Sequence, residues 1–263
     1  VHLMRTVLVL LLLALPGLTA QTPNRVIALD GITEYAYSVI IGGFNPNEIS
    51  VEAWIRPDAP GTPQRETRVV SKGSEGTQGL PDGRFSLTYI EDMAGGPMAG
   101  IATFRVYLGS FIPNDQAVVS SPMPVPTGQW THLAGTFSNV SGQVALYVNG
   151  SIVAATGTSM GGFPLTGMTM TSTPQPLSIG AIPPTPSQPT TTAFRGQIDE
   201  VRVWSMERTS NEIASSFTQE LSSGPGMVDA WHFNGNALGT FNIPPAGVTP
   251  VGGSPRYPIS FVP

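Results

Sequence analysis

The sequence has no cysteine among its 263 residues. Disulfide bonds, thiolate nucleophiles and cysteine-ligated zinc sites are therefore excluded. A short secreted domain would need such cross-links, whereas a chain of this length can bury a core that is large enough to fold without them. We expect the stability of this protein to come from the packing of its own core.

Charged side chains are also scarce, at 11% of the chain compared with roughly 25% in an average soluble domain. The formal net charge is −5, and no basic cluster stands out in the sequence. Because nucleic-acid binding requires basic side chains that neutralise phosphates, no nucleic-acid partner is expected.

Long apolar runs are missing except at residues 7–15, near the N-terminus. Arg5 precedes this run, and the small residue Ala20 ends the segment that follows it. This pattern is typical of a secretory signal peptide, so we predict a signal peptide over 1–20 and a mature domain over 21–263. The alternative is a membrane anchor, but the run is shorter than the roughly 20 residues that cross a bilayer. The predicted location is outside the cell or on its surface, with the periplasm as an alternative.

Turn-forming residues, in contrast, are abundant, with 30 glycines and 26 prolines. Between them lie short segments in which apolar and polar residues alternate, which is the pattern of a half-buried strand. In residues 50–56, Val51, Ala53 and Ile55 are predicted to lie on one face, and Glu52, Trp54 and Arg56 on the other. Further predicted strands are 84–89, 103–108, 130–137, 143–148, 151–155, 198–204 and 227–233.

Two local signals refine this pattern. Asn149-Gly150 separates two strand-like segments, and this pair favours a two-residue hairpin because a type I′ turn needs positive φ at both central positions. Residues 207–217 form the single plausible helix, in which Ile213 and Phe217 are four positions apart.

The domain organisation depends on the proline-rich segment 182–189, which could be a linker or a long loop. The hydrophobic segments on its two sides are too few to form two cores. We therefore predict a single domain over 21–263, whose glycine- and proline-rich tail from about 235 to 263 wraps the surface.

Eight segments, taken in order, resemble the LamG-like domain, also called the concanavalin A-like or pentraxin-like jelly roll, of bacterial secreted proteins. The resemblance covers about residues 25–263 and includes Asp30-Gly31, residues 49–57 and the Gly128–Gly150 hairpin region. It also includes residues 194–204, which end in Trp204. The resemblance implies an all-β, two-sheet antiparallel jelly-roll sandwich with at most one short helix. The four tryptophans, Trp54, Trp130, Trp204 and Trp231, are predicted to serve mainly in packing.

Some relatives of this fold are laminarinase-like glycosidases, whose catalytic strand carries two glutamates around an aspartate. Retaining hydrolysis needs two carboxyl groups about 5–5.5 Å apart. Gln197 and Arg202 occupy the positions where the glutamates are expected, and Asp199 and Glu200 are adjacent. Neighbouring strand residues point to opposite faces, so these two carboxylates are predicted to diverge. We expect no enzymatic activity.

The histidines of the predicted mature chain, His132 and His232, are far apart in sequence and lie in strand-like segments. No Gly-x-Ser-x-Gly elbow accompanies them, so a serine triad is not indicated. Both are predicted to be structural side chains.

Calcium is the cofactor that the resemblance implies, because many LamG-like and pentraxin-like domains hold such an ion. Asp30 and Asp199 match motif positions of the family and are the candidate ligands. The alternative is that Asp30-Gly31 forms a turn and that Asp199 accepts bonds from backbone amides.

The function predicted from these features is a secreted, non-catalytic binding or adhesion module for glycans or a cell-surface partner. A self-assembling surface or filament protein is the alternative, since low charge and many small polar residues suit packing against further copies. A glycosidase comes third. Because this sandwich serves lectins, enzymes and scaffolds alike, the fold does not decide among these three.

Overall fold

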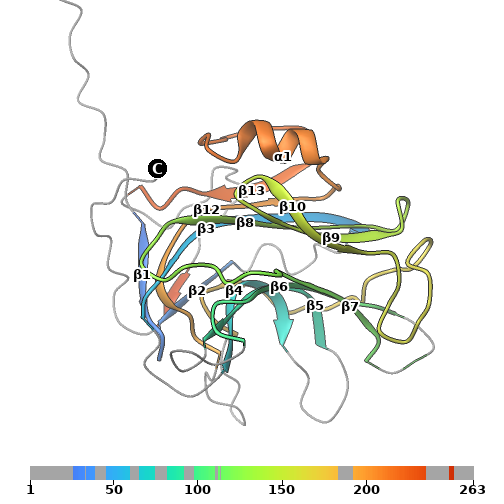
Figure 1. Ribbon diagram of the computed structural model, residues 1–263, viewed down its shortest axis with the longest axis horizontal. Helices are drawn as coiled ribbons and strands as arrows, with labels where there is room; N and C mark the ends of the chain where they lie inside the picture. Colours follow the sequence, from blue (N-terminus) through green and yellow to red (C-terminus); the bar gives the residue numbers. More distant parts are fainter. Residues whose placement is uncertain are drawn as a thin grey trace, which may run out of the picture.

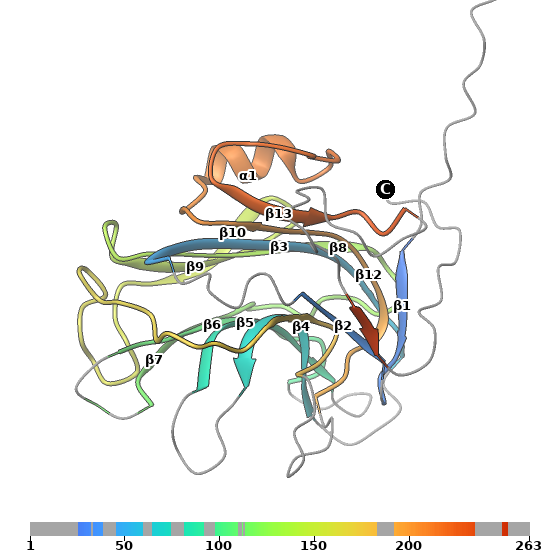
Figure 2. The ribbon, with the colours of Figure 1, turned by 180° about the vertical axis from the view of Figure 1, so that it is seen from behind.

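The computed structural model describes residues 26–32, 34–38, 46–59, 65–74, 82–91, 98–109, 112, 114–182, 192–234 and 249–251. The predicted signal peptide, most of the proline-rich segment and most of the predicted tail lie outside these residues. Two antiparallel sheets stack face to face, with one short helix on the outer side of the first sheet (Figures 1 and 2). The all-β sandwich predicted from the sequence is confirmed.

The first sheet has the spatial order β1 (Ile27–Asp30), β12 (Arg195–Trp204), β3 (Glu48–Pro57), β8 (Thr131–Ser138), β9 (Gln143–Val148) and β10 (Ser151–Thr156). In addition to these neighbours, β12 pairs with β13 (Met227–Trp231). The first and twelfth strands are thus neighbours, with Ile27 opposite Ile198, so distant parts of the sequence close the sheet.

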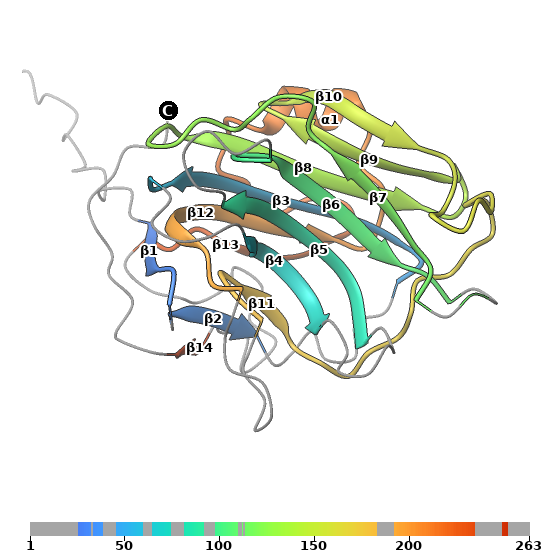
Figure 3. The ribbon, with the colours of Figure 1, turned by 60° about the horizontal axis from the view of Figure 1, so that its bottom comes forward.

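The second sheet has the order β14 (Thr249–Val251), β2 (Tyr35–Ser38), β11 (Leu177–Ile179), β4 (Arg65–Ser74), β5 (Asp82–Glu91), β6 (Ala102–Tyr107) and β7 (Gln116–Ser120). Figure 3 shows β4, β5, β6 and β7 in front of the first sheet. Part of the predicted tail therefore adds a strand at the edge of this sheet, because β14 pairs with β2.

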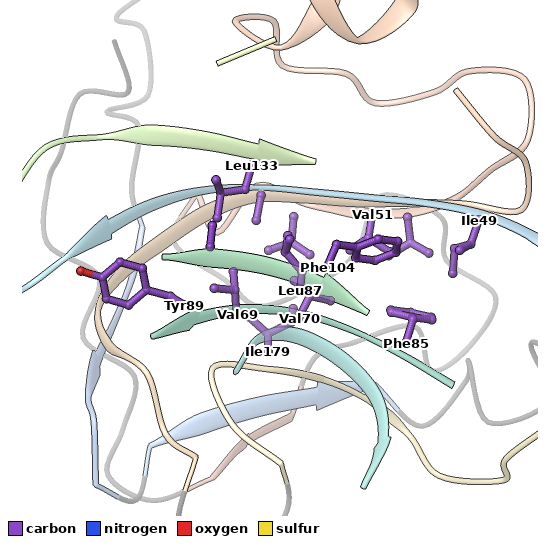
Figure 4. Close-up of a cluster of buried hydrophobic side chains, with 14 of the residues drawn as sticks. Ile49, Val51, Val69, Val70, Phe85, Leu87, Tyr89, Phe104, Leu133 and Ile179 are labelled. Carbon is purple, nitrogen blue, oxygen red and sulfur yellow. The ribbon is translucent and has the colours of Figure 1, made fainter. Parts of the chain in front are cut away.

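The core fills the space between the two sheets, where apolar side chains of both inner faces meet (Figure 4). Val51 and Leu133 come from the first sheet, and Leu87 and Phe104 from the second. Gly135 is essential to this packing, because a Cβ atom there would lie 2.2 Å from the ring of Phe104. Because Gly135 has no side chain, the Phe104 ring of the opposite sheet can lie close to the backbone of β8.

The hairpin between β9 and β10 forms as predicted. Val148 pairs with Ser151, and Asn149 and Gly150 have φ values of 48° and 77°. The Asn149 side chain also accepts a hydrogen bond from the amide of His132, at 2.9 Å. The turn is thereby tied to the neighbouring strand β8.

Helix α1 (Ser210–Ser216) begins three residues later than predicted. Thr209 is its N-cap and forms a capping box with Glu212, which fixes the first turn at this position. The helix belongs to the segment that covers the outer face of the first sheet (Figure 1). No helix within the described residues is long and apolar enough to cross a membrane.

Candidate functional site

Part of the outer face of the first sheet is buried next to α1. Val51, Ala53 and Ile55 lie in the core as predicted, and Glu52 and Trp54 are buried as well. The Trp54 indole donates a hydrogen bond to the carbonyl oxygen of Phe217, at 2.8 Å. The alternation of apolar and polar residues in β3 therefore identified its inner face correctly. The opposite face is buried by the segment that contains α1.

Glu52 is the centre of a buried ionic cluster on this face. Its Oε1 accepts a hydrogen bond from Arg208 at 2.6 Å, and its Oε2 lies 3.2 Å from both Arg202 Nη2 and His132 Nε2. Burial alone would raise the pKa of Glu52, but the hydrogen bond with His132 and the charges of Arg202 and Arg208 lower this pKa to about 2. His132 is fully buried in this cluster, in agreement with the structural role predicted for it.

Trp204 continues this cluster, because the guanidinium group of Arg208 lies 4.5 Å from the centre of its ring. Trp54, Trp204 and Trp231 are all nearly inaccessible to solvent. The packing role predicted for these three tryptophans is confirmed.

A β-bulge interrupts β12 at the acidic pair Asp199-Glu200. Asp199 pairs with Trp54 and Arg202 with Glu52, so two residues of β12 oppose one residue of β3. Glu200 takes up the extra position with φ of 47°. The bulge keeps the neighbouring apolar residues of β12 in the core on both sides of the irregularity.

The predicted divergence of Asp199 and Glu200 is therefore wrong, because the bulge breaks the alternation on which the prediction rested. Asp199 pairs with Trp54, whose side chain is on the outer face. The Glu200 carboxylate reaches His232, which follows the core residue Trp231 and points the other way. Both carboxylates thus lie on the outer face of the first sheet.

Three elements meet at this bulge and bring together Glu200, Glu220 and His232. Glu200 belongs to β12, Glu220 to the loop after α1, and His232 follows β13 directly. His232 Nδ1 lies 2.7 Å from Glu200 Oε1 and 3.9 Å from Glu220 Oε1. One ligand atom from each of the three residues lies within 4.8 Å of the other two. We call Asp199, Glu200, Glu220 and His232 the bulge cluster.

The bulge cluster contains buried polar atoms whose bonding is incomplete. Asp199 Oδ1 accepts a bond from the Glu200 amide at 2.9 Å. Asp199 Oδ2, Glu200 Oε2 and His232 Nε2 are buried, and none of them has a hydrogen-bond partner within the part of the chain that the structure describes. Buried polar atoms without partners are rare in folded proteins and call for an explanation.

Two side chains of the bulge cluster, Asp199 and His232, have shifted pKa values. Burial, followed by the charge of Glu200, raises the pKa of Asp199 to about 9. Burial would lower the pKa of His232, but its hydrogen bond with Glu200 and the charges of Glu200 and Glu220 raise it overall. Asp199 therefore retains a proton at neutral pH that an isolated aspartate would not hold.

The two residues predicted to bind calcium do not converge. Asp30 pairs with Arg195, four positions before Asp199 on β12, which is about 13 Å along a strand. The Oδ1 atom of Asp30 accepts bonds from the amides of Ile32 and Glu34, as in the turn considered as the alternative. One ion cannot bind both carboxylates, and calcium at either residue alone stays a prediction.

The two positions that would need catalytic glutamates are occupied by residues with structural contacts. Gln197 accepts a hydrogen bond from Arg56 at 3.2 Å. Arg202 is fully buried and bound to Glu52 and to the carbonyl oxygens of Ser216 and Gln219. Neither side chain can serve as the acid or the nucleophile of glycoside hydrolysis.

Sequence reasoning missed the bulge cluster, although one signal pointed to the bulge. The core residues Ile198 and Val201 are three positions apart, and a regular strand would place them on opposite faces. Glu220 carries no comparable signal, because it belongs to a loop and reaches the cluster through tertiary structure.

Comparison with known proteins agrees with this architecture. The model of the concanavalin A-like lectin/glucanases superfamily matches residues 30–214. No curated protein matches the sequence.

Three solved structures are similar in fold. A protein of Bacteroides ovatus assigned to carbohydrate binding has a TM-score of 0.61 and 18% identity; the match covers 88% of this chain and 60% of that protein. A heptameric SAP-like pentraxin of Limulus polyphemus has a TM-score of 0.51 and 16% identity, with 78% and 86% covered. The CBM40 module of a Ruminococcus gnavus sialidase has a TM-score of 0.50 and 14% identity, with 73% and 95% covered. Because the family model spans most of the sequence, this chain belongs to the concanavalin A-like lectin/glucanase superfamily.

Proposed function

We propose that this protein is a secreted, non-catalytic module that binds glycans on a cell surface or in the surrounding matrix. The observation that carries the proposal is which residues occupy the two catalytic positions of β12. The strand that would supply catalytic glutamates has Gln197 and Arg202 instead, and Arg202 is committed to a buried ion pair with Glu52. A member of this superfamily without the catalytic pair retains a framework for binding.

The fold comparison supports the same proposal. The Bacteroides ovatus protein assigned to carbohydrate binding matches over 88% of this chain, and the Ruminococcus gnavus module is part of a sialidase. The superfamily also includes glucanases, and the replaced residues of β12 favour binding over catalysis.

A surface at one end of the sandwich could receive a sugar. Met160 and Phe163 lie in the loop after β10 and are 71% and 38% exposed, and Ile112 is 40% exposed. The loop contacts the Ile112 region, because a Cβ atom on Gly161 would lie 2.7 Å from Ile112 Cδ1. Asp115 accepts a bond from the Gly161 amide nearby, at 3.0 Å. Exposed apolar side chains suit the apolar C–H face of a sugar ring.

The proposal is tested by applying the purified protein to a glycan array and to immobilised polysaccharides. Selective retention of a monomer supports glycan binding. Phe163→Ala should weaken that binding, whereas Met123→Ala, which removes a 72% exposed side chain from the loop after β7, should leave it unchanged. If the protein binds no glycan and copurifies as large particles, glycan binding is refuted in favour of a self-assembling structural protein.

A further inference from the structure

We propose that the bulge cluster is a binding site for a divalent transition-metal ion, and that Zn²⁺ is its best probe. Glu200, Glu220 and His232 are the ligands, and Asp199 is the additional carboxylate. The site is independent of the proposed glycan surface. It shares Asp199 with the calcium site predicted from the sequence, but not Asp30.

The spacing of the donor atoms suits a single ion. Zinc binds oxygen and nitrogen ligands at about 2.0–2.2 Å, so two ligand atoms of one ion lie no more than about 4.4 Å apart. His232 Nδ1 is 2.7 Å from Glu200 Oε1 and 3.9 Å from Glu220 Oε1. The Glu220 side chain is 54% exposed and free to adjust, so a small rotation would complete the set.

The incomplete bonding of buried atoms points to a ligand. Asp199 is 0% exposed and Glu200 is 4% exposed, and each has one carboxylate oxygen without a partner among the described residues. Both residues lie at the bulge, where the charge of Glu200 acts directly on Asp199. A bound cation would supply the partner that these oxygens lack.

The charge of the cluster favours a cation as well. Glu200 and Glu220 lie beside one imidazole, Asp199 adds a third carboxyl group next to Glu200, and the guanidinium of Arg202 is paired with Glu52. A divalent ion would offset this excess of carboxylates.

The donor set selects the class of metal. Imidazole nitrogen favours zinc and its neighbours, whereas calcium takes six to eight oxygen ligands. One histidine with two or three carboxylates therefore fits Zn²⁺ better than Ca²⁺.

The test is calorimetric titration of the tag-free protein, after chelator treatment, with Zn²⁺ and with Ca²⁺. We expect one Zn²⁺ per chain and weaker or no binding of Ca²⁺. Glu220→Gln should raise the dissociation constant for Zn²⁺ by about 10-fold or more, because it removes a direct ligand. This variant should fold normally, since Glu220 is largely exposed. His232→Gln should have at least the same effect.

Glu207→Gln is the matched control, because its carboxylate lies among Ser141 and Glu48, outside the cluster, and Zn²⁺ affinity should not change. Thermal unfolding of each metal-free variant shows whether it is folded, and if His232→Gln is not, Glu220→Gln decides. Absence of Zn²⁺ binding, tighter binding of Ca²⁺ than of Zn²⁺, or equal Zn²⁺ affinity in wild type and Glu220→Gln would each overturn the proposal.

Discussion

Replacing Glu52 by glutamine tests whether the ionic cluster next to α1 stabilises the fold. The substitution keeps the shape of the side chain but leaves Arg202 and Arg208 buried without their counter-ion. The pKa of Glu52 falls from 4.5 to about 2 on folding, which corresponds to about 3 kcal/mol. Loss of one partner of a buried ion pair costs about 3–5 kcal/mol, which agrees. We expect Glu52→Gln to lose about 3–4 kcal/mol of unfolding free energy at pH 7.

The sign of the pH dependence follows from the direction of the shift. The folded-state pKa of Glu52 lies below its unfolded value, so its contribution is complete above about pH 4.5 and is lost as the pH falls toward 2. The difference in stability between wild type and Glu52→Gln should therefore shrink steadily as the pH is lowered below about 5. Urea unfolding at pH 7, 5 and 3 measures this difference, and Glu207→Gln serves as the control. Equal stability at pH 7, or a difference that does not change with pH, would refute the reasoning.

Four further predictions rest on other features. Gly150→Val should cost about 1 kcal/mol or more, because it forces a β-branched residue to φ of 77° and toward the phenyl ring after α1; an unchanged melting temperature would count against the turn. Gly135→Ala should cost at least about 2 kcal/mol by overpacking against Phe104, whereas Gly157→Ala, with no atom closer than 3.5 Å, should be tolerated; equal unfolding midpoints would contradict this packing. The pure protein should release no reducing sugar from laminarin or agarose; release that disappears when an acidic residue of the bulge is mutated would reverse the assignment. N-terminal sequencing of secreted protein should begin near Gln21, and retention of the apolar run would exclude cleavage there.

The sequence predicted the strands well because their inner faces follow a simple rule. Val51, Ala53 and Ile55 alternate as a strand with one buried face requires, and all three lie in the core. The same rule failed for Glu52 and Trp54, because burial of the outer face depends on where α1 packs. Local patterns report the contacts that every strand of a sandwich makes, but not those that a distant segment adds.

The start of α1 was predicted three residues too early, although the sequence contains a local signal for it. Residues 207–217 contain helix formers, yet Thr209 and Glu212 form a capping box, so the helix begins at Ser210. Arg208, just before the cap, instead extends to Glu52 and joins the ionic cluster. A threonine three positions before a glutamate was visible in the sequence and would have corrected the start.

The two polar clusters on the outer face of the first sheet differ in charge balance, and that difference separates a structural role from a binding role. Glu52 faces two guanidinium groups and one imidazole, and both of its oxygens are bonded, so the charge of this carboxylate is offset without a ligand. The bulge cluster has three carboxyl groups and one imidazole, and several of its buried atoms lack partners among the described residues. Arg202, one strand position from the bulge, bonds to Glu52 rather than to a carboxylate of the bulge. A strand that pairs regularly would have sent Glu200 into the core, where no partner could offset its charge. The bulge instead places this carboxylate beside His232, and a cation is the ligand that would complete the arrangement.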